Sequence, residues 1–269
     1  MDYRLIALDL DDTLLDSSKR ISRRNREAID AVRIKGAHVV IATGRAYGAL
    51  TQFRDTLGLH DYSIHIGGAL ISDPDGRLIY GDYIAPESVR SIMEWAVKRG
   101  IYFQVYTDRD YRYLQRTVHT ENYERNVEFA GIEDPDLLTR EDLRAAKILL
   151  IDTEKTVPEF RRELSPQYPD LSFETSMPWF LEISNRSASK GNALRYIGRH
   201  LGIPAEQTAA FGDSEIDLSM IEYAGLGAAM ANAAPEIRAA ADVVVPSNTD
   251  DGVAWGLEKY CLHADRQND

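Results

Sequence analysis

The sequence predicts an α/β protein in which a doubly wound parallel sheet is interrupted by an inserted α+β domain. Short apolar runs alternate with amphipathic helical patterns up to residue 66 and again after residue 190, as in a parallel sheet with helical crossovers. The stretch between them lacks this alternation, and its part from residue 83 onward holds seven of the 14 tyrosines. We therefore expect a core built from residues 1–82 and 188–269, and an inserted domain at residues 83–187.

The first part of the core is predicted to alternate strand and helix. Ser22 can cap the first helix and Gly36 can end it. The run Asp-Pro-Asp-Gly at residues 73–76 is a turn sequence between two strand-like flanks. The predicted strands are 4–8, 37–42, 62–66 and the hairpin 71–80, and the predicted helices are 22–35 and a second one that ends near residue 57.

The remaining elements follow from the same patterns. In the inserted domain, the predicted helices are 86–99 and 157–164, and the predicted strands are 101–106, a short one after the turn at 107–110, 147–151 and 180–184. In the last part of the core, the predicted helices are 190–201, 216–223 and 235–240, and the predicted strands are 208–211, 226–230 and 243–245.

Composition and charge exclude several classes of protein. The 269 residues carry 31 basic and 43 acidic side chains, a net charge of −12, so a general nucleic-acid-binding surface is not expected. The single cysteine, Cys261, excludes an internal disulfide and a cysteine-built zinc site. No apolar run approaches the roughly 20 residues of a membrane helix, and Asp2 and Asp9 argue against a signal peptide. We expect a soluble cytoplasmic protein that binds neither nucleic acid nor membranes; its oligomeric state is left open.

Polar residues follow several predicted strands of the core. Ligands of an open parallel sheet bind beyond the carboxyl ends of its strands, and converging carboxylates there favour a hard divalent cation such as Mg²⁺. A hydroxyl and backbone N–H groups at a helix start favour a phosphate. Lys190 opens a helix, where the helix dipole disfavours a cation without a partner. The residues at these strand ends are Asp9, Asp11 and Asp12, Thr43 and Gly44, and Asp213.

Four segments resemble, in order, the motifs of the haloacid dehalogenase superfamily, in its Cof-type sugar-phosphatase branch. They are Asp-Leu-Asp-Asp-Thr-Leu-Leu at 9–15, Thr-Gly-Arg at 43–45, Ser-Lys-Gly-Asn-Ala-Leu at 189–194 and Gly-Asp-Ser-Glu-Ile-Asp at 212–217. The resemblance implies a Rossmann-like core and a cap domain between the second and third motifs, which is where the composition changes. It also implies hydrolysis of a small phosphorylated metabolite, with a sugar phosphate as the expected substrate.

The resemblance also implies a role for each motif residue. Asp9 is the expected nucleophile, which forms an aspartyl-phosphate, and Asp11 is the expected general acid and base. Mg²⁺ is expected on Asp9, the backbone carbonyl of Asp11, and Asp213. The residues expected to hold the phosphoryl oxygens are Leu10 and Gly44 through their N–H groups, Thr43 and Lys190. Arg45, Ser214 and Asp217 are expected to orient these groups without contacting the phosphate themselves.

Two positions depart from the family pattern. Ile216 and Gly67 each stand where the family usually has asparagine, and the loss of one hydrogen-bond donor to a phosphoryl oxygen can slow a reaction by ~10²–10³-fold. Ser214 is a candidate replacement donor. Two alternatives stay open. One is a phosphosugar mutase or phosphotransferase, which would share Asp9 and Asp11; the other, favoured by these two departures, is a weakly active or non-catalytic phosphometabolite-binding protein. His65 lies at a predicted strand end, and a structural role is favoured over a contact with substrate.

Overall fold

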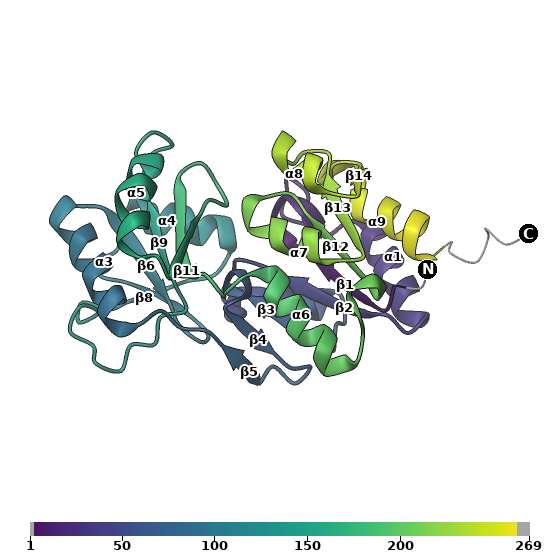
Figure 1. Ribbon diagram of the computed structural model, residues 1–269, viewed down its shortest axis with the longest axis horizontal. Coiled ribbons are helices and arrows are strands. Elements are labelled where there is room, and N and C mark those ends of the chain that lie inside the picture. Colours follow the sequence, from purple (N-terminus) through teal and green to yellow (C-terminus); the bar gives the residue numbers. More distant parts are fainter. Residues whose placement is uncertain (1–2, 263–269) are drawn as a thin grey trace, which may run out of the picture.

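The computed structural model describes residues 3–262, which form two sheets (Figure 1). The larger sheet has eight strands in the order β14-β13-β12-β1-β2-β3-β4-β5 and is parallel from β14 to β3. The last two pairings are antiparallel. Its strands are β1 (Leu5–Leu8), β2 (His38–Ala42), β3 (Ser63–His65), β4 (Leu70–Ser72), β5 (Leu78–Gly81), β12 (Thr208–Gly212), β13 (Leu226–Met230) and β14 (Val243–Val245).

Helices cover both faces of this sheet, as the doubly wound prediction requires. Ile6 and Leu8 face α1 (Arg23–Ile34), α2 (Tyr47–Thr56) and α9 (Gly252–Gly256), whereas Leu5 and Ala7 face α6 (Lys190–Leu201) and α7 (Leu218–Tyr223). This alternation buries β1 on both sides. The helix α8 (Pro235–Ala240) packs beside α7. The α/β fold class predicted from the sequence is confirmed.

The second sheet is formed by residues between the second and third motifs, and lies on the left in Figure 1. Its strands are β6 (Tyr102–Tyr106), β7 (Tyr111–Tyr113), β8 (Ile132–Glu133), β9 (Lys147–Ile151), β10 (Leu171–Glu174) and β11 (Phe180–Asn185), in the order β10-β11-β9-β6-β7-β8. The helices α3 (Pro86–Arg99) and α5 (Val157–Leu164) pack on one face. On the other face lie α4 (Val118–Val127), buried tyrosines and residues of the core.

Strand periodicity decides which side chains of the inserted domain face the core. Ile148 and Leu150 pack under α3 and α5, whereas Leu149 and Ile151 lie on the opposite face. Successive side chains of a strand point to opposite faces, so Lys147 shares the face of Leu149 and points toward the core.

Several elements differ from the sequence prediction. The strands β8 and β10, the helix α4 and the C-terminal helix were not predicted. The chain around α4 is polar and offers few apolar positions, but Thr117 and Thr120 form a capping box that starts it. The strand predicted at 62–66 ends at His65 because Ile66 and Gly67 adopt positive φ angles of 52° and 65°.

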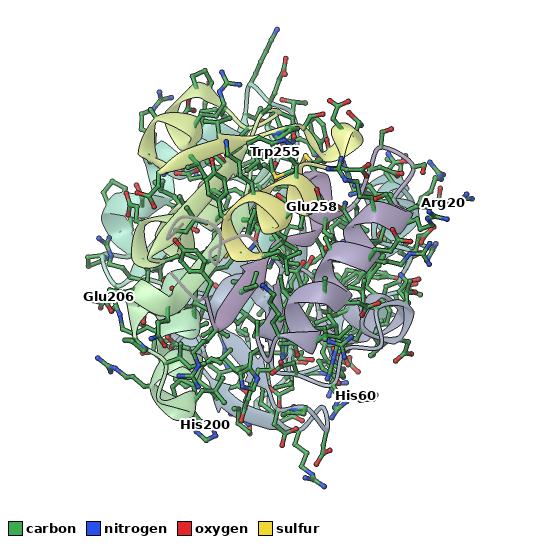
Figure 2. All side chains as sticks on the ribbon, turned by 90° about the vertical axis from the view of Figure 1, so that its right-hand side faces the viewer. Arg20, His60, His200, Glu206, Trp255 and Glu258 are labelled. Atoms are coloured by element: carbon green, nitrogen blue, oxygen red, sulfur yellow. The ribbon has the colours of Figure 1, made fainter. Side chains whose placement is uncertain are left out.

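Figure 2 shows the end of the core that lies farthest from the second sheet. His60 and His200 are at its surface, with Trp255 and Glu258 on the last helical segment. Within residues 3–262, the one group of acidic, His or Cys side chains close enough to hold a metal ion is made of aspartates, with no histidine. No helix among these residues is both long and apolar enough to span a membrane.

Candidate active site

Three neighbouring strands bring the predicted site residues to one edge of the core sheet. Asp9 follows β1, Thr43 follows β2 and Asp213 follows β12, and the sheet order places β1 between β12 and β2. Because these strands are parallel, their carboxyl ends meet at the same edge. The sequence pattern and the sheet topology therefore agree on where the candidate site lies.

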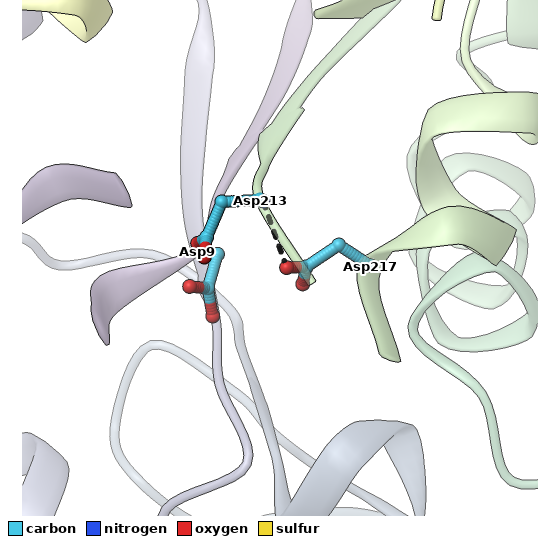
Figure 3. Close-up of side chains that lie close together, drawn as sticks. All are labelled: Asp9, Asp213 and Asp217. Carbon is cyan, nitrogen blue, oxygen red and sulfur yellow. Dashed lines mark hydrogen bonds between the residues drawn. The ribbon is translucent and has the colours of Figure 1, made fainter. Parts of the chain in front are cut away.

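Three aspartates converge at this edge, with carboxylate oxygens within 4.8 Å of one another: Asp9, Asp213 and Asp217. Figure 3 shows the carboxylates of Asp9 and Asp213 side by side, with that of Asp217 turned toward them. Asp217 is held by the loop before it. Its Oδ2 accepts hydrogen bonds from the backbone N–H of Asp213 (3.1 Å) and of Ser214 (3.0 Å).

Lys190 supplies the positive charge of this cluster. Its Nζ donates to Asp9 Oδ1 (2.6 Å) and to Asp217 Oδ1 (2.5 Å), and the side chain is fully buried. The first turn of α6 reaches this position because Gly68 has no side chain. A Cβ there would lie 2.2 Å from the backbone carbon of Ser189, so any larger residue would push α6 away from the aspartates.

The electrostatics of the cluster favour a bound cation. Burial and the charge of Asp217 raise the pKa of Asp9 well above its usual value, against the opposing effect of Lys190. Burial and Asp217 also raise the pKa of Asp213, to about 7. Burial opposes the Lys190 ammonium, but Asp217 and Asp9 outweigh it and raise its pKa. Three carboxylates, two of them buried, thus lie around one ammonium, and their oxygen atoms suit a hard divalent cation.

Asp11 is paired with basic side chains rather than with the other aspartates. Arg45 donates to both of its oxygens, through Nε and Nη2, each at 2.7 Å, and Lys19 Nζ donates at 3.1 Å. Burial acts to raise the pKa of Asp11, but these contacts outweigh it and lower the pKa. Arg45 also donates to the backbone carbonyl of Val127 in the inserted domain (2.8 Å). Asp11 therefore sits where the core meets the inserted domain.

The predicted phosphate-binding residues lie around the same point. Leu10 directly follows Asp9 and its side chain is buried in the core, which leaves only its backbone available. Gly44 lines the cavity above the aspartates. Thr43 is buried, and its Oγ1 accepts a hydrogen bond from the N–H of Arg45 (3.1 Å). This bond fixes the Thr43 hydroxyl within the loop after β2.

The inserted domain contributes half of the cavity wall. Lys147 donates to the carbonyl of Gly44 (2.8 Å) and to Glu182 Oε2 (2.7 Å), and Ser176 donates to the other oxygen of Glu182. Lys147, Ser176 and Glu182 were not among the residues predicted from the sequence. Two of them are charged residues in otherwise apolar strand sequences, Lys147 in Lys-Ile-Leu-Leu-Ile and Glu182 in Phe-Leu-Glu-Ile-Ser. A charged side chain in such a strand could have indicated that one face of the strand lines a polar site.

A third contact joins the two parts of the molecule beside the fourth motif. Glu215 accepts hydrogen bonds from Arg161 Nη2 (2.9 Å) and from Thr175 Oγ1 (2.8 Å), both in the inserted domain. Together with the contacts of Arg45 and Lys147, it holds the inserted domain over the aspartates.

The two departures from the family pattern have different surroundings. Ile216 lines the cavity, and its Cδ1 would lie 3.4 Å from a Cβ placed on Gly44. Gly67 has a positive φ, and nothing lies within 4 Å of a Cβ placed there. The hydroxyl of Ser214 donates to Asp217 Oδ2 (2.8 Å). The one proton of the Ser214 hydroxyl is therefore directed at Asp217 in this structure.

His65 is a core residue and does not line the cavity at the aspartates. Its side chain is fully buried, Nε2 lies 3.0 Å from Ser72 Oγ, and Nδ1 has no hydrogen-bond partner among the described residues. Burial lowers the pKa of His65 to about 3, with Arg109 and Arg54 adding to the effect. The structural role favoured by the sequence agrees with these surroundings.

Acid should destabilise the protein through His65. Between pH 6.5, the ordinary pKa, and pH about 3, the unfolded chain binds a proton at His65 that the folded chain does not. The free energy of unfolding should therefore fall by about 1.4 kcal/mol for each pH unit below 6.5. Denaturant titrations of wild type and His65→Gln from pH 7.5 to 4.5 check this, with the exposed His200→Gln as control. Equal pH slopes for wild type and His65→Gln would contradict it.

The chain matches known proteins over nearly its whole length. The model of the haloacid dehalogenase-like hydrolase family matches residues 6–257. Phosphatase YwpJ of Bacillus subtilis (strain 168) is 31% identical over 277 residues, covering 93% of this chain and 97% of that protein. The 5-amino-6-(5-phospho-D-ribitylamino)uracil phosphatase YcsE of the same strain is 29% identical over 267 residues, covering 97% of each chain.

A solved structure gives the same result. A haloacid dehalogenase-like hydrolase from B. subtilis has a TM-score of 0.87 at 30% identity, covering 96% of this chain and 99% of the other. The resemblance drawn from the four motifs is confirmed, as is the predicted enzyme class, since the relatives are named as phosphatases. The chain belongs to the haloacid dehalogenase-like hydrolase family, in its Cof-type branch.

Proposed function

We propose that the protein is a Mg²⁺-dependent phosphomonoester hydrolase that acts on small sugar or polyol phosphates through an aspartyl-phosphate on Asp9. The observation that carries the proposal is the Asp9 carboxylate itself. It is buried at the floor of a cavity, held by Lys190 at 2.6 Å and placed beside Asp213. The relative that is named for a ribityl phosphate substrate supports the choice of substrate class.

In the first step, a carboxylate oxygen of Asp9 attacks phosphorus, and the bond from phosphorus to the substrate oxygen breaks. Asp11 gives its proton to that departing oxygen, so the product leaves as a neutral alcohol. The backbone N–H groups of Leu10 and Gly44 and the hydroxyl of Thr43 bind the phosphoryl oxygens. Lys190 balances their charge while it orients Asp9.

In the second step, water attacks the phosphorus of the aspartyl-phosphate and the bond to Asp9 breaks. Asp11 takes a proton from this water and returns to its starting form. The pairing of Asp11 with Arg45 and Lys19 suits this basic role, because it keeps the carboxylate ionised. We infer that substrate binding loosens the pairing, so that Asp11 takes up a proton from solvent before it acts as an acid.

Asp9, Asp213 and the backbone carbonyl of Asp11 are the proposed ligands of Mg²⁺. The ion would offset the repulsion between the Asp9 carboxylate and a phosphate dianion. Asp217 is close enough to the other two aspartates to belong to this group, but Lys190 and the loop N–H groups already use its oxygens. We assign Asp217 the supporting role expected from the sequence.

We propose that the inserted domain, residues 83–187, is a cap that closes over this site and hinges at its two connections. Asp82 accepts hydrogen bonds from Asn185 Nδ2 (2.6 Å) and Ser187 Oγ (2.6 Å), and Asn185 also donates to the carbonyl of Tyr83 (2.8 Å). These bonds tie the outgoing and returning segments together, which supports boundaries at residues 83 and 187.

A non-catalytic phosphometabolite-binding protein is the second candidate. Ile216 favours it, because an apolar methyl group borders the phosphate-binding loop at the position where the family usually has an amide. The intact set of Asp9, Asp11, Asp213 and Lys190 favours hydrolysis. A mutase would use the same residues and differ only in the acceptor.

Removal of the metal tests the proposal. Purified protein should hydrolyse p-nitrophenyl phosphate and sugar phosphates in the presence of Mg²⁺, and EDTA should reduce the rate by at least about 10²-fold, because the ion offsets the repulsion of the attacking carboxylate. Release of inorganic phosphate is the measurement, and added Mg²⁺ should restore it. Phosphate release at the same rate in Mg²⁺ and in EDTA would rule out the proposed function. Transfer to added sugars in place of release would identify a mutase.

A further inference from the structure

A second cavity lies in the inserted domain beside the catalytic one. Its volume is about 450 Å³, whereas that of the catalytic cavity is about 70 Å³. The two cavities adjoin, because four residues line both of them: Tyr123, Asn126, Met177 and Phe180. The larger cavity is of the size that metabolites fill in proteins.

Aromatic side chains form the walls of the larger cavity. Trp179 is 45% exposed at its rim. The rings of Trp179 and Phe180 meet edge to face, with centroids 6.2 Å apart and planes at 81°. Two rings at this angle form a corner, which a flat ring can fill by stacking on one and meeting the edge of the other. Tyr123 and His119 line the same space.

The polar groups of the cavity restrict the charge of its ligand. Asn122, Asn126 and Asp152 line it, and neither lysine nor arginine does among its described lining residues. The Asp152 carboxylate repels a second anionic group and can accept hydrogen bonds from N–H donors. The cavity therefore suits an uncharged ring with N–H groups, in contrast to the basic surroundings of Asp11.

We propose that this cavity is the subsite for the non-phosphorylated end of the substrate, and that it takes a flat, uncharged ring that carries N–H donors. The inference rests on the proposed function, because the phosphate end of the same molecule lies at Asp9. Trp179 and Phe180 are the residues that select the ring, and Asp152 selects against a second anion.

The test compares phosphate esters that differ only in the ring. Riboflavin 5′-phosphate is matched with ribitol 5-phosphate, and uridine 5′-monophosphate with ribose 5-phosphate. In wild type, kcat/KM should be about tenfold higher for the ring-bearing member of at least one pair, as expected for one ring stacked on an aromatic side chain. Trp179→Ala should bring the ratio to within about twofold of one. Val118→Ala, at an exposed apolar position of α4 that does not line the cavity, should keep the wild-type ratio.

A binding measurement separates this inference from the proposed function. Calorimetric titration of the Asp9→Asn protein with the same pairs should show the same preference in Kd and the same loss of preference on adding Trp179→Ala. If no ester is hydrolysed but the ring-bearing member binds about tenfold more tightly, the proposed function fails and the subsite stands. If all four esters are hydrolysed and bound without preference, or if Trp179→Ala leaves the preference unchanged, the subsite is overturned and the hydrolase stands.

Discussion

Asp9→Asn should abolish phosphate release, with kcat reduced on the order of 10⁴-fold or more. The amide has nearly the shape of the carboxylate but is not a nucleophile toward phosphorus, so the aspartyl-phosphate cannot form. The variant also removes one of the negative charges that would hold the metal. Initial rates with Mg²⁺ and a sugar phosphate measure the loss of turnover. A search for phosphate bound to the protein after rapid acid quench tests whether the aspartyl-phosphate still forms.

The control for this variant is Asp55→Asn, which makes the same chemical change at an exposed position of α2. It should retain the wild-type rate. Thermal unfolding of both variants shows whether the loss of activity follows from chemistry or from loss of the fold. Residual turnover within tenfold of wild type, in Asp9→Asn protein shown by mass to be free of deamidation, would mean that another group attacks phosphorus.

The half of the candidate site that belongs to the core could be predicted because its residues are marked by position as well as by type. Asp9 interrupts an apolar run at the end of a strand, and Lys190 opens a helix where the dipole disfavours it. Parallel strands bring such ends together whatever the details of packing. The order of the four motifs, which resembles that of the family, then predicted that these residues form one site.

The half of the cavity that belongs to the inserted domain could not be predicted in the same way. Lys147 and Glu182 lie in short buried strands, and the sequence does not tell whether their face meets solvent, a helix or another domain. That depends on how the second sheet is placed against the core through contacts such as those of Arg45 with Val127 and of Arg161 with Glu215. These pairs are more than 50 residues apart in the sequence, and no local pattern encodes them.

Loss of the buried ammonium of Lys190 should lower the free energy of unfolding strongly. Lys190→Met keeps a side chain of similar length but removes the charge, which leaves the carboxylates of Asp9 and Asp217 buried without their partner. Breaking a buried ion pair in this way costs about 3–5 kcal/mol. Urea titration in EDTA should show this loss in the free energy of unfolding, and phosphate release should fall as well.

Two further variants show whether the loss comes from the charges. Lys98→Met, at an exposed position of α3, should change the free energy of unfolding by less than about 0.5 kcal/mol. Lys190→Met combined with Asp217→Asn should be more stable than Lys190→Met alone, because the second substitution removes one of the two carboxylates left without a partner. A double-mutant cycle gives the coupling between the two residues. If Lys190→Met costs less than about 1 kcal/mol, or if Asp217→Asn makes it less stable still, these carboxylates are not held in the folded protein by the ammonium, and the charge balance derived for the site is wrong.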